Sequence, residues 1–249
     1  MEDWLSSSAS GGIRFETTHW SMVCRAGAAD EENRAAFESL YRSYSHPVYV
    51  FLRRRGYSSH EAQDLTQEFF LHLLQKNTPN KADPLRGKFR TFLLSALGFF
   101  LLHAHEKAGT QKRGGDAIMV FLDENSAETR YQLTDPGQTA EQIFDARWAA
   151  TLIQATIDRL KTEMETAGKG ELFNKIRGFL IETAKTSYAE VAQATGLTVA
   201  AVKTAIHRLR IRYRDLLREE IARTVASPAD FDDEVRALRA SLLSGYLRS

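Results

Sequence analysis

The stretch SYAEVAQATGLTVAAVKTAIHRLRIRYR, residues 187–214, determines the predicted fold of the second half of the chain. Ser187 and Glu190 have the spacing of a capping box, which begins a helix. Gly196 stands where a helix ends in the left-handed conformation, and Thr198 can cap a second, longer helix that contains neither Gly nor Pro. The pattern predicts two helices joined by a tight turn.

The predicted second helix has a buried stripe and a basic face. Its apolar residues recur every three or four positions, as on a helix face that packs against a core: Val202, Ile206, Leu209, Tyr213 and Leu216. Residues 198–218 contain six bases and one acid, a net charge of +5. A short capped helix, a glycine turn and a basic helix are typical of the helix-turn-helix, whose second helix enters the DNA major groove. The alternative is a solvated basic face on an ordinary helical hairpin.

Charge is distributed unevenly along the 249 residues. The net charge is only +1, but residues 116–147 hold seven acids and two bases, a net of −5. Cys24 is the only cysteine, which excludes an internal disulfide framework and fits a reducing compartment. Residues 1–12 lack the basic and apolar regions of a signal peptide. We therefore expect a cytoplasmic protein without membrane insertion.

The first half of the chain is also helical in pattern. Ser58 and Glu61 have the spacing of another capping box, and a broad apolar face follows them. Residues 77–90 contain Asn, Pro and Gly and are expected to form a basic loop. Residues 92–102 are largely apolar but span only about 16 Å as a helix, roughly half a bilayer core, so a buried bundle helix is expected. Its core residues are expected to include Phe99 and Phe100.

One predicted helix face carries three acids and a histidine: Glu61, Asp64, Glu68 and His72. Such a face can contribute to an iron or manganese site in a helical bundle, which normally requires Glu-x-x-His motifs on two helices. The sequence does not contain such a pair, so an acidic surface facing solvent or a partner is the preferred interpretation. The chain also lacks a phosphate-binding loop and a nucleophile motif. We expect no enzyme activity, no metal and no cofactor.

The sequence therefore predicts an all-α protein with two small helical domains joined by an acidic linker. Asp135-Pro136-Gly137 is the clearest break in that linker. The last helix is expected to begin at Ser227-Pro228, with acids near its N-terminus that the helix dipole favours. The expected boundaries are a loose tail at 1–13, a first domain at 14–113, the linker at 114–142, the helix-turn-helix domain at 143–225 and an accessory helix at 226–249.

Two blocks of this sequence together resemble one protein family. The first block contains DLTQEFFLHLL, GKFRTFLLSAL and QKRGG, and the second is the helix-turn-helix stretch quoted above. The resemblance is to bacterial RNA polymerase sigma factors of the extracytoplasmic-function (ECF) group, and it covers about residues 17–225. It implies a winged-helix-like sigma domain in the second half. It also implies core RNA polymerase and promoter DNA as partners, and an anti-sigma or other regulatory protein is a further candidate partner.

The resemblance also assigns roles to residues. The surface that docks on core polymerase is implied to include Asp64, Leu65, Gln67, Glu68, Phe69 and Leu71. The start-proximal promoter element is implied to meet residues 81–90 and 103–113, the latter with Lys107, Lys112 and Arg113. The acidic linker is implied to run toward the RNA-exit path of the polymerase.

Within the second predicted helix, the N-terminal turns enter the groove deepest. The candidates for contacts with base edges are Thr198, Val199, Ala200, Lys203, Thr204 and His207. The candidates for contacts with phosphates are Arg208, Arg210, Arg212 and Arg214, of which Arg208 could also reach a base. Two other functions stay open at this point: a free-standing helix-turn-helix regulator that does not bind polymerase, and a helical-bundle metalloenzyme.

We predict that Lys203→Ala changes sequence preference by about 1–3 kcal/mol at one base pair, because a lysine can contact a base edge. Arg210→Ala should instead weaken binding to all sequences. It should also lower by about one the salt slope, which is the magnitude of the slope of the logarithm of the binding constant against the logarithm of the salt concentration. Binding of each variant to a panel of duplexes at several salt concentrations checks both. Unchanged binding by both variants would show that this helix does not read DNA.

Overall fold

The computed structural model describes residues 31–75, 88–107, 127–128, 131, 137–180 and 186–246. All regular structure within these ranges is helical, so the all-α prediction is confirmed. The described chain divides into two compact units, one containing residues 152–220 and one containing the earlier helices together with residues 221–249. The compact units therefore group residues 143–151 and the C-terminal helix with the first block. No described helix is both long and apolar enough to cross a membrane.

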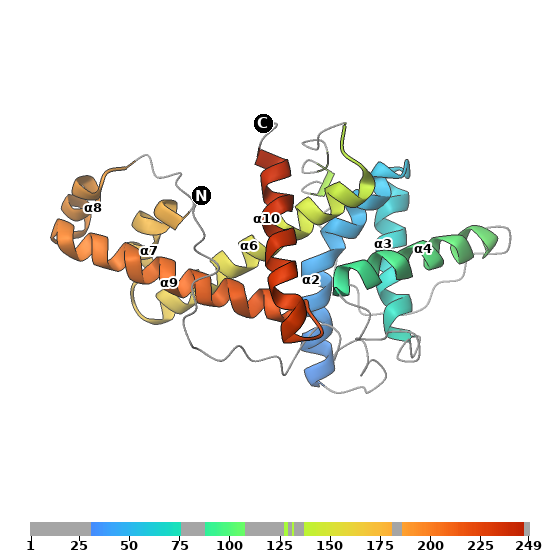
Figure 1. The fold of residues 1–249 in the computed structure, drawn as a ribbon, viewed down its shortest axis with the longest axis horizontal. Helices are drawn as coiled ribbons and strands as arrows, with labels where there is room; N and C mark the ends of the chain where they lie inside the picture. Colours follow the sequence, from blue (N-terminus) through green and yellow to red (C-terminus); the bar gives the residue numbers. More distant parts are fainter. Residues whose placement is uncertain are drawn as a thin grey trace. The chain divides into compact units, whose positions relative to one another are not determined.

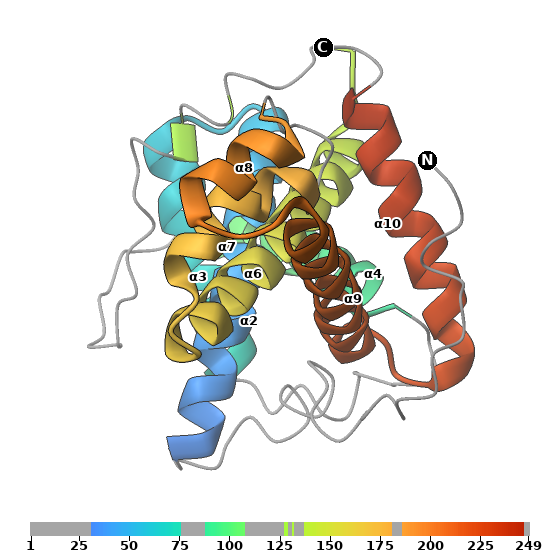
Figure 2. The ribbon, with the colours of Figure 1, turned by 90° about the vertical axis from the view of Figure 1, so that its left-hand side faces the viewer.

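The first block is built on two helices, α2 (Glu31–Arg54) and α3 (Ser59–Gln75), which lie side by side (Figures 1 and 2). The backbone between them turns at Gly56, whose φ is 96°. The predicted capping box then begins α3. The Ser58 amide donates to Glu61 Oε2 at 2.9 Å, and the Glu61 amide donates to Ser58 Oγ at 3.3 Å.

The helix α4 (Phe89–Lys107) contacts both of these helices through aromatic rings. The ring centroids of Phe89 and Tyr44 lie 5.4 Å apart, and those of Phe100 and Phe69 lie 5.6 Å apart. Phe100 is buried as predicted, but Phe99 is 67% exposed, so that prediction was wrong. Successive side chains on a helix point in different directions, and only one of two adjacent residues can face the core.

A buried ion pair joins α4 to the C-terminal helix α10 (Phe231–Tyr246), which follows a short 3-10 helix, η4 (Pro228–Asp230). Arg90 Nε lies 3.1 Å from Glu234 Oε1, and Glu234 is fully buried. The same guanidinium contacts Asp145 at 2.5 Å and lies 4.8 Å from the ring centroid of Trp148, both on α6 (Ala140–Thr166). The sequence-based assignment of Arg90 to a basic loop was therefore wrong, because α4 begins at Phe89.

The buried charges of this cluster compensate each other. Burial alone disfavours a charged guanidinium, but the carboxylates of Glu234 and Asp145 outweigh that effect and raise the pKa of Arg90. A second cation, the Lys88 ammonium, lies 3.6 Å from Glu234 Oε2. Because each charge has an opposite partner, the cluster can remain ionised away from water.

Glu234→Ala should lower the free energy of unfolding by about 3–5 kcal/mol, because it leaves the Arg90 charge buried without one of its two carboxylate partners. Asp232→Ala is the matched control: it removes an exposed acid from the same helix turn, and its effect should stay within about 0.5 kcal/mol. Urea unfolding of the full chain, followed by tryptophan fluorescence, measures both.

The double variant Arg90→Met/Glu234→Leu should recover most of that loss, because it replaces both charges with apolar groups. If Glu234→Ala were as stable as Asp232→Ala, the ion pair would not hold α10 in place.

Part of the predicted acidic linker contacts α2. Glu128 accepts two hydrogen bonds from Arg53, at 2.9 and 2.7 Å, and a third from the Tyr49 hydroxyl at 2.6 Å. The hydrogen bonds from Arg53 lower the pKa of the Glu128 carboxyl. Arg55 contacts Glu141 at 2.8 Å, just inside α6. At these positions the linker is held by Arg53 in the last turn of α2 and by Arg55 just after the helix.

The second unit contains the remainder of α6, then α7 (Gly170–Ile176), η3 (Arg177–Leu180), α8 (Tyr188–Thr195) and most of α9 (Val199–Arg223). The predicted apolar stripe of α9 is confirmed, since all five of its residues are buried: Val202, Ile206, Leu209, Tyr213 and Leu216. Phe173, Ile176 and Phe179 from α7 and η3, and Val191 and Ala192 from α8, are buried in the same unit. This core fixes which side of α9 remains exposed.

Candidate nucleic-acid interface

The helix α8 begins and ends as predicted. The Ser187 amide donates to Glu190 Oε2 at 2.6 Å, and the Glu190 amide donates to Ser187 Oγ at 3.2 Å. Gly196 ends the helix at φ 68°, and its amide donates to the Ala192 carbonyl. A Cβ at Gly196 would meet no atom within 4 Å, so backbone conformation and not space requires glycine there.

The N-terminal turns of α9 expose one side to solvent. The Ala201 amide donates to Thr198 Oγ1 at 3.2 Å, which confirms the predicted cap. The Thr204 hydroxyl donates to the Ala200 carbonyl at 3.0 Å. All the residues predicted to face base edges are exposed: Thr198, Val199, Ala200, Lys203, Thr204 and His207.

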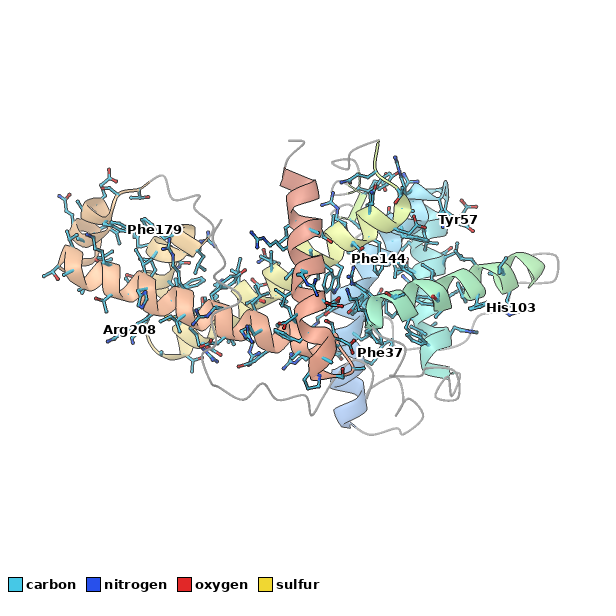
Figure 3. All side chains as sticks on the ribbon, viewed as in Figure 1. Phe37, Tyr57, His103, Phe144, Phe179 and Arg208 are labelled. Carbon is cyan, nitrogen blue, oxygen red and sulfur yellow. The ribbon has the colours of Figure 1, made fainter. Side chains whose placement is uncertain are left out.

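The four arginines predicted to contact phosphates have different surroundings. Arg208 is exposed and has no hydrogen bond or ion pair within the described residues. It lies on the side of α9 away from Phe179 (Figure 3). Arg210 donates two hydrogen bonds to the Phe179 carbonyl, at 3.0 and 2.8 Å. The Arg214 side chain is only 18% exposed, and its Nε lies 3.9 Å from Asp215.

The guanidinium of Arg212 belongs to an ion network between α6 and α9. Arg212 donates to both carboxylate oxygens of Glu163, at 2.8 and 2.7 Å, and these hydrogen bonds lower the pKa of the Glu163 carboxyl. Arg159 extends the network through Glu219 at 2.6 Å and Glu220 at 3.1 Å. Arg210 and Arg212 therefore have partners within the unit. Arg208, and not Arg210, is the arginine best placed to contact a phosphate, so the loss of salt dependence predicted for Arg210→Ala is now expected for Arg208→Ala.

An aromatic pair beside the turn was missed by the sequence analysis. The rings of Phe179 and Tyr188 are stacked with their centroids 5.1 Å apart. The Lys203 ammonium lies 5.8 Å from the Tyr188 ring centroid, within the range of a cation–π interaction. The only signal of this pair in the sequence was an aromatic residue, Tyr188, directly after the capping Ser187.

The predicted polymerase-facing residues of α3 differ in exposure. Asp64 and Glu68 are exposed, and Leu65, Gln67 and Leu71 are partly exposed. Phe69 is fully buried, with its ring packed against Phe70 and Phe100. Phe69 thus supports the helix from inside, and we leave it out of the candidate surface.

Comparison with known proteins finds one family model and two relatives that agree with each other. Residues 40–108, which include all of α3 and α4 and part of α2, match the family described as Sigma-70 region 2. The chain is 27% identical over 228 residues to the ECF RNA polymerase sigma factor SigE of Mycolicibacterium smegmatis, covering 90% of this chain and 75% of that protein. It is also 27% identical over 207 residues to the ECF RNA polymerase sigma factor SigX of Bacillus subtilis, covering 82% and 91%. These matches support an ECF sigma factor. No solved structure matches the chain.

The region 2 match of this chain ends at residue 108, one residue past α4. The outer side of α4 exposes two large apolar side chains, Phe99 at 67% and Leu102 at 64%. His103 is exposed beside them. The predicted DNA contacts of Lys107, Lys112 and Arg113 fall outside the described residues, except for the Lys107 backbone at the end of α4.

The metal-site alternative gains no support from the described residues, among which no group of three or more His, Cys, Asp or Glu residues could hold a metal ion. Glu61, one of the four candidates, is engaged in the capping box with Ser58. That hydrogen bonding lowers the pKa of the Glu61 carboxyl. The capping box therefore explains the acidic residue at position 61 without a metal ion.

Arg208 and Arg212 form a matched pair for a test of the DNA-facing side. Arg208→Ala should weaken binding to every duplex and lower the salt slope by about one, because one phosphate contact is lost. Arg212→Ala should leave the slope unchanged, because its charge is already paired with Glu163. Fluorescence anisotropy of the full chain with a preferred duplex at several salt concentrations measures both slopes. Equal slopes for the two variants would contradict this assignment.

Proposed function

We propose that this sigma factor binds core RNA polymerase and directs promoter-specific transcription initiation. The observation that carries the proposal is the combination, in one chain, of a sigma-70 region 2 with a helix-turn-helix whose second helix is exposed and basic at its N-terminal half. The first element fits a large protein partner and the second fits DNA. Sigma factors are transcription initiation factors and not a family of catalysts, so the polymerase performs the phosphoryl transfer.

We assign recognition of the upstream promoter element to α8 and α9. In a helix-turn-helix the second helix lies in the major groove and its N-terminal residues meet base edges. Lys203, His207 and Arg208 are exposed on that part of α9, and none of them has an acidic partner in the described chain. Lys203 and His207 are suited to base edges, and Arg208 is suited to the phosphate backbone.

We assign the contact with core polymerase to the outer side of α3. Asp64 and Glu68 are one helical turn apart and exposed, with the partly exposed Leu65 and Leu71 beside them. An acidic surface with apolar residues fits a basic and apolar partner surface, because charge complementarity steers association and apolar burial stabilises the complex.

We assign the contact with the start-proximal promoter element to the exposed side of α4. An exposed aromatic ring such as Phe99 can stack on an unpaired base, an interaction worth about 1–3 kcal/mol per base. Arg90 is removed from the DNA-facing set implied by the family resemblance, because it is buried against Glu234.

Core polymerase should retain the wild-type chain in a pull-down, and Asp64→Lys or Glu68→Lys should abolish most of that retention, because each reverses a charge at the proposed contact. Asp232→Lys, which reverses an exposed acid on α10, is the matched control and should be retained like the wild type. Circular dichroism confirms that each variant is folded.

A wild-type chain that polymerase does not retain, but that selects palindromic duplexes, would instead favour a free-standing regulator. Equal retention of all three variants would move the polymerase contact away from α3.

A further inference from the structure

The tip of the helix-turn-helix exposes apolar side chains. Leu197 in the turn is 39% exposed and Val199 at the start of α9 is 41% exposed, although most other large apolar side chains of this unit are buried. Ala200 follows directly and is also exposed. These residues lie where a helix-turn-helix meets the floor of the major groove.

The polar groups at the same tip are partly engaged within the protein. Thr198 Oγ1 accepts the capping hydrogen bond from the Ala201 amide. The Thr204 hydroxyl donates its proton to the Ala200 carbonyl, which leaves its methyl group as its main apolar contact surface. None of these side chains carries the paired donor and acceptor groups with which Arg, Asn or Gln recognise a base. Hydrogen bonding therefore explains little of the sequence discrimination at the first turns of α9.

The major groove offers one apolar group, the C5 methyl of thymine, and Ala and Thr methyl groups are known types of contact for it. Two exposed cations, Lys203 and Arg208, and the exposed His207 follow the apolar tip on α9. This arrangement favours a polyanionic partner that carries apolar groups over an uncharged apolar protein surface.

We propose that Val199, Ala200 and the Thr204 methyl group recognise thymine methyl groups in the upstream promoter element. The inference rests on the proposed function and narrows its ligand to duplexes with thymines opposite the first two turns of α9. Lys203 then supplies the polar contact of this surface, from the side on which Tyr188 holds its ammonium.

Deoxyuridine tests this proposal, because it keeps the base pairing of thymine and lacks only the methyl group. A preferred duplex is first selected from a randomised pool by the full chain bound to core polymerase. Each thymine of the upstream element is then replaced singly by deoxyuridine. The wild type should lose about four-fold in affinity at one or more positions, the equivalent of ~0.8 kcal/mol for one buried methyl group.

Two variants connect each loss to a side chain. Thr204→Ser removes a methyl group but keeps the hydroxyl and its hydrogen bond to Ala200, and Val199→Ala removes two exposed methyl groups. At least one of them should bind the thymine and deoxyuridine duplexes equally at a position where the wild type distinguishes them. Lys203→Ala, the control, should weaken binding but keep the distinction.

Equal wild-type binding to all deoxyuridine duplexes would overturn the methyl proposal and leave promoter binding intact. The methyl proposal would also be overturned if Thr204→Ser and Val199→Ala both distinguished thymine from deoxyuridine as strongly as the wild type does. Failure of the wild type to select any duplex would instead count against the proposed function itself.

Discussion

The buried stripe of α9 determines what this chain presents to DNA. The side chains of Val202, Ile206 and Leu209 are buried in the core. Because each of them fits a packed interior, α9 can rotate very little about its axis. The opposite side of its N-terminal half then has a fixed composition of methyl groups, one lysine, one histidine and one arginine. The same packing assigns Arg210 and Arg212 to internal partners, and so separates cations that hold the unit together from cations that remain for a ligand.

The local features of this fold were predictable from the sequence, because their causes lie within a few residues of each other. The capping boxes at Ser58 and Ser187, the left-handed Gly196 and the buried stripe of α9 each depend on spacing over one or two helical turns. The residues predicted to face base edges are exposed on α9, and their contact with DNA stays a prediction.

The interactions that the sequence analysis missed connect distant residues. Arg210 bonds a carbonyl 31 residues earlier, and Arg212 bonds a carboxylate 49 residues earlier. A pattern of basic residues does not show which of them already have a partner. Phe99 was misplaced for a related reason: the apolar run around it predicts burial for every member, whereas the neighbouring helices cover only one side of α4.

The ion pair between Arg90 and Glu234 spans 144 residues of sequence. At synthesis rates of about 5–20 residues per second, a ribosome needs roughly 7 to 29 seconds to reach the glutamate after it has added the arginine. Throughout that interval the nascent first block contains the guanidinium without its principal counter-charge. The unit that carries region 2 therefore acquires its complete interior only as the last helix of the described chain is translated, which orders its maturation after that of the helix-turn-helix.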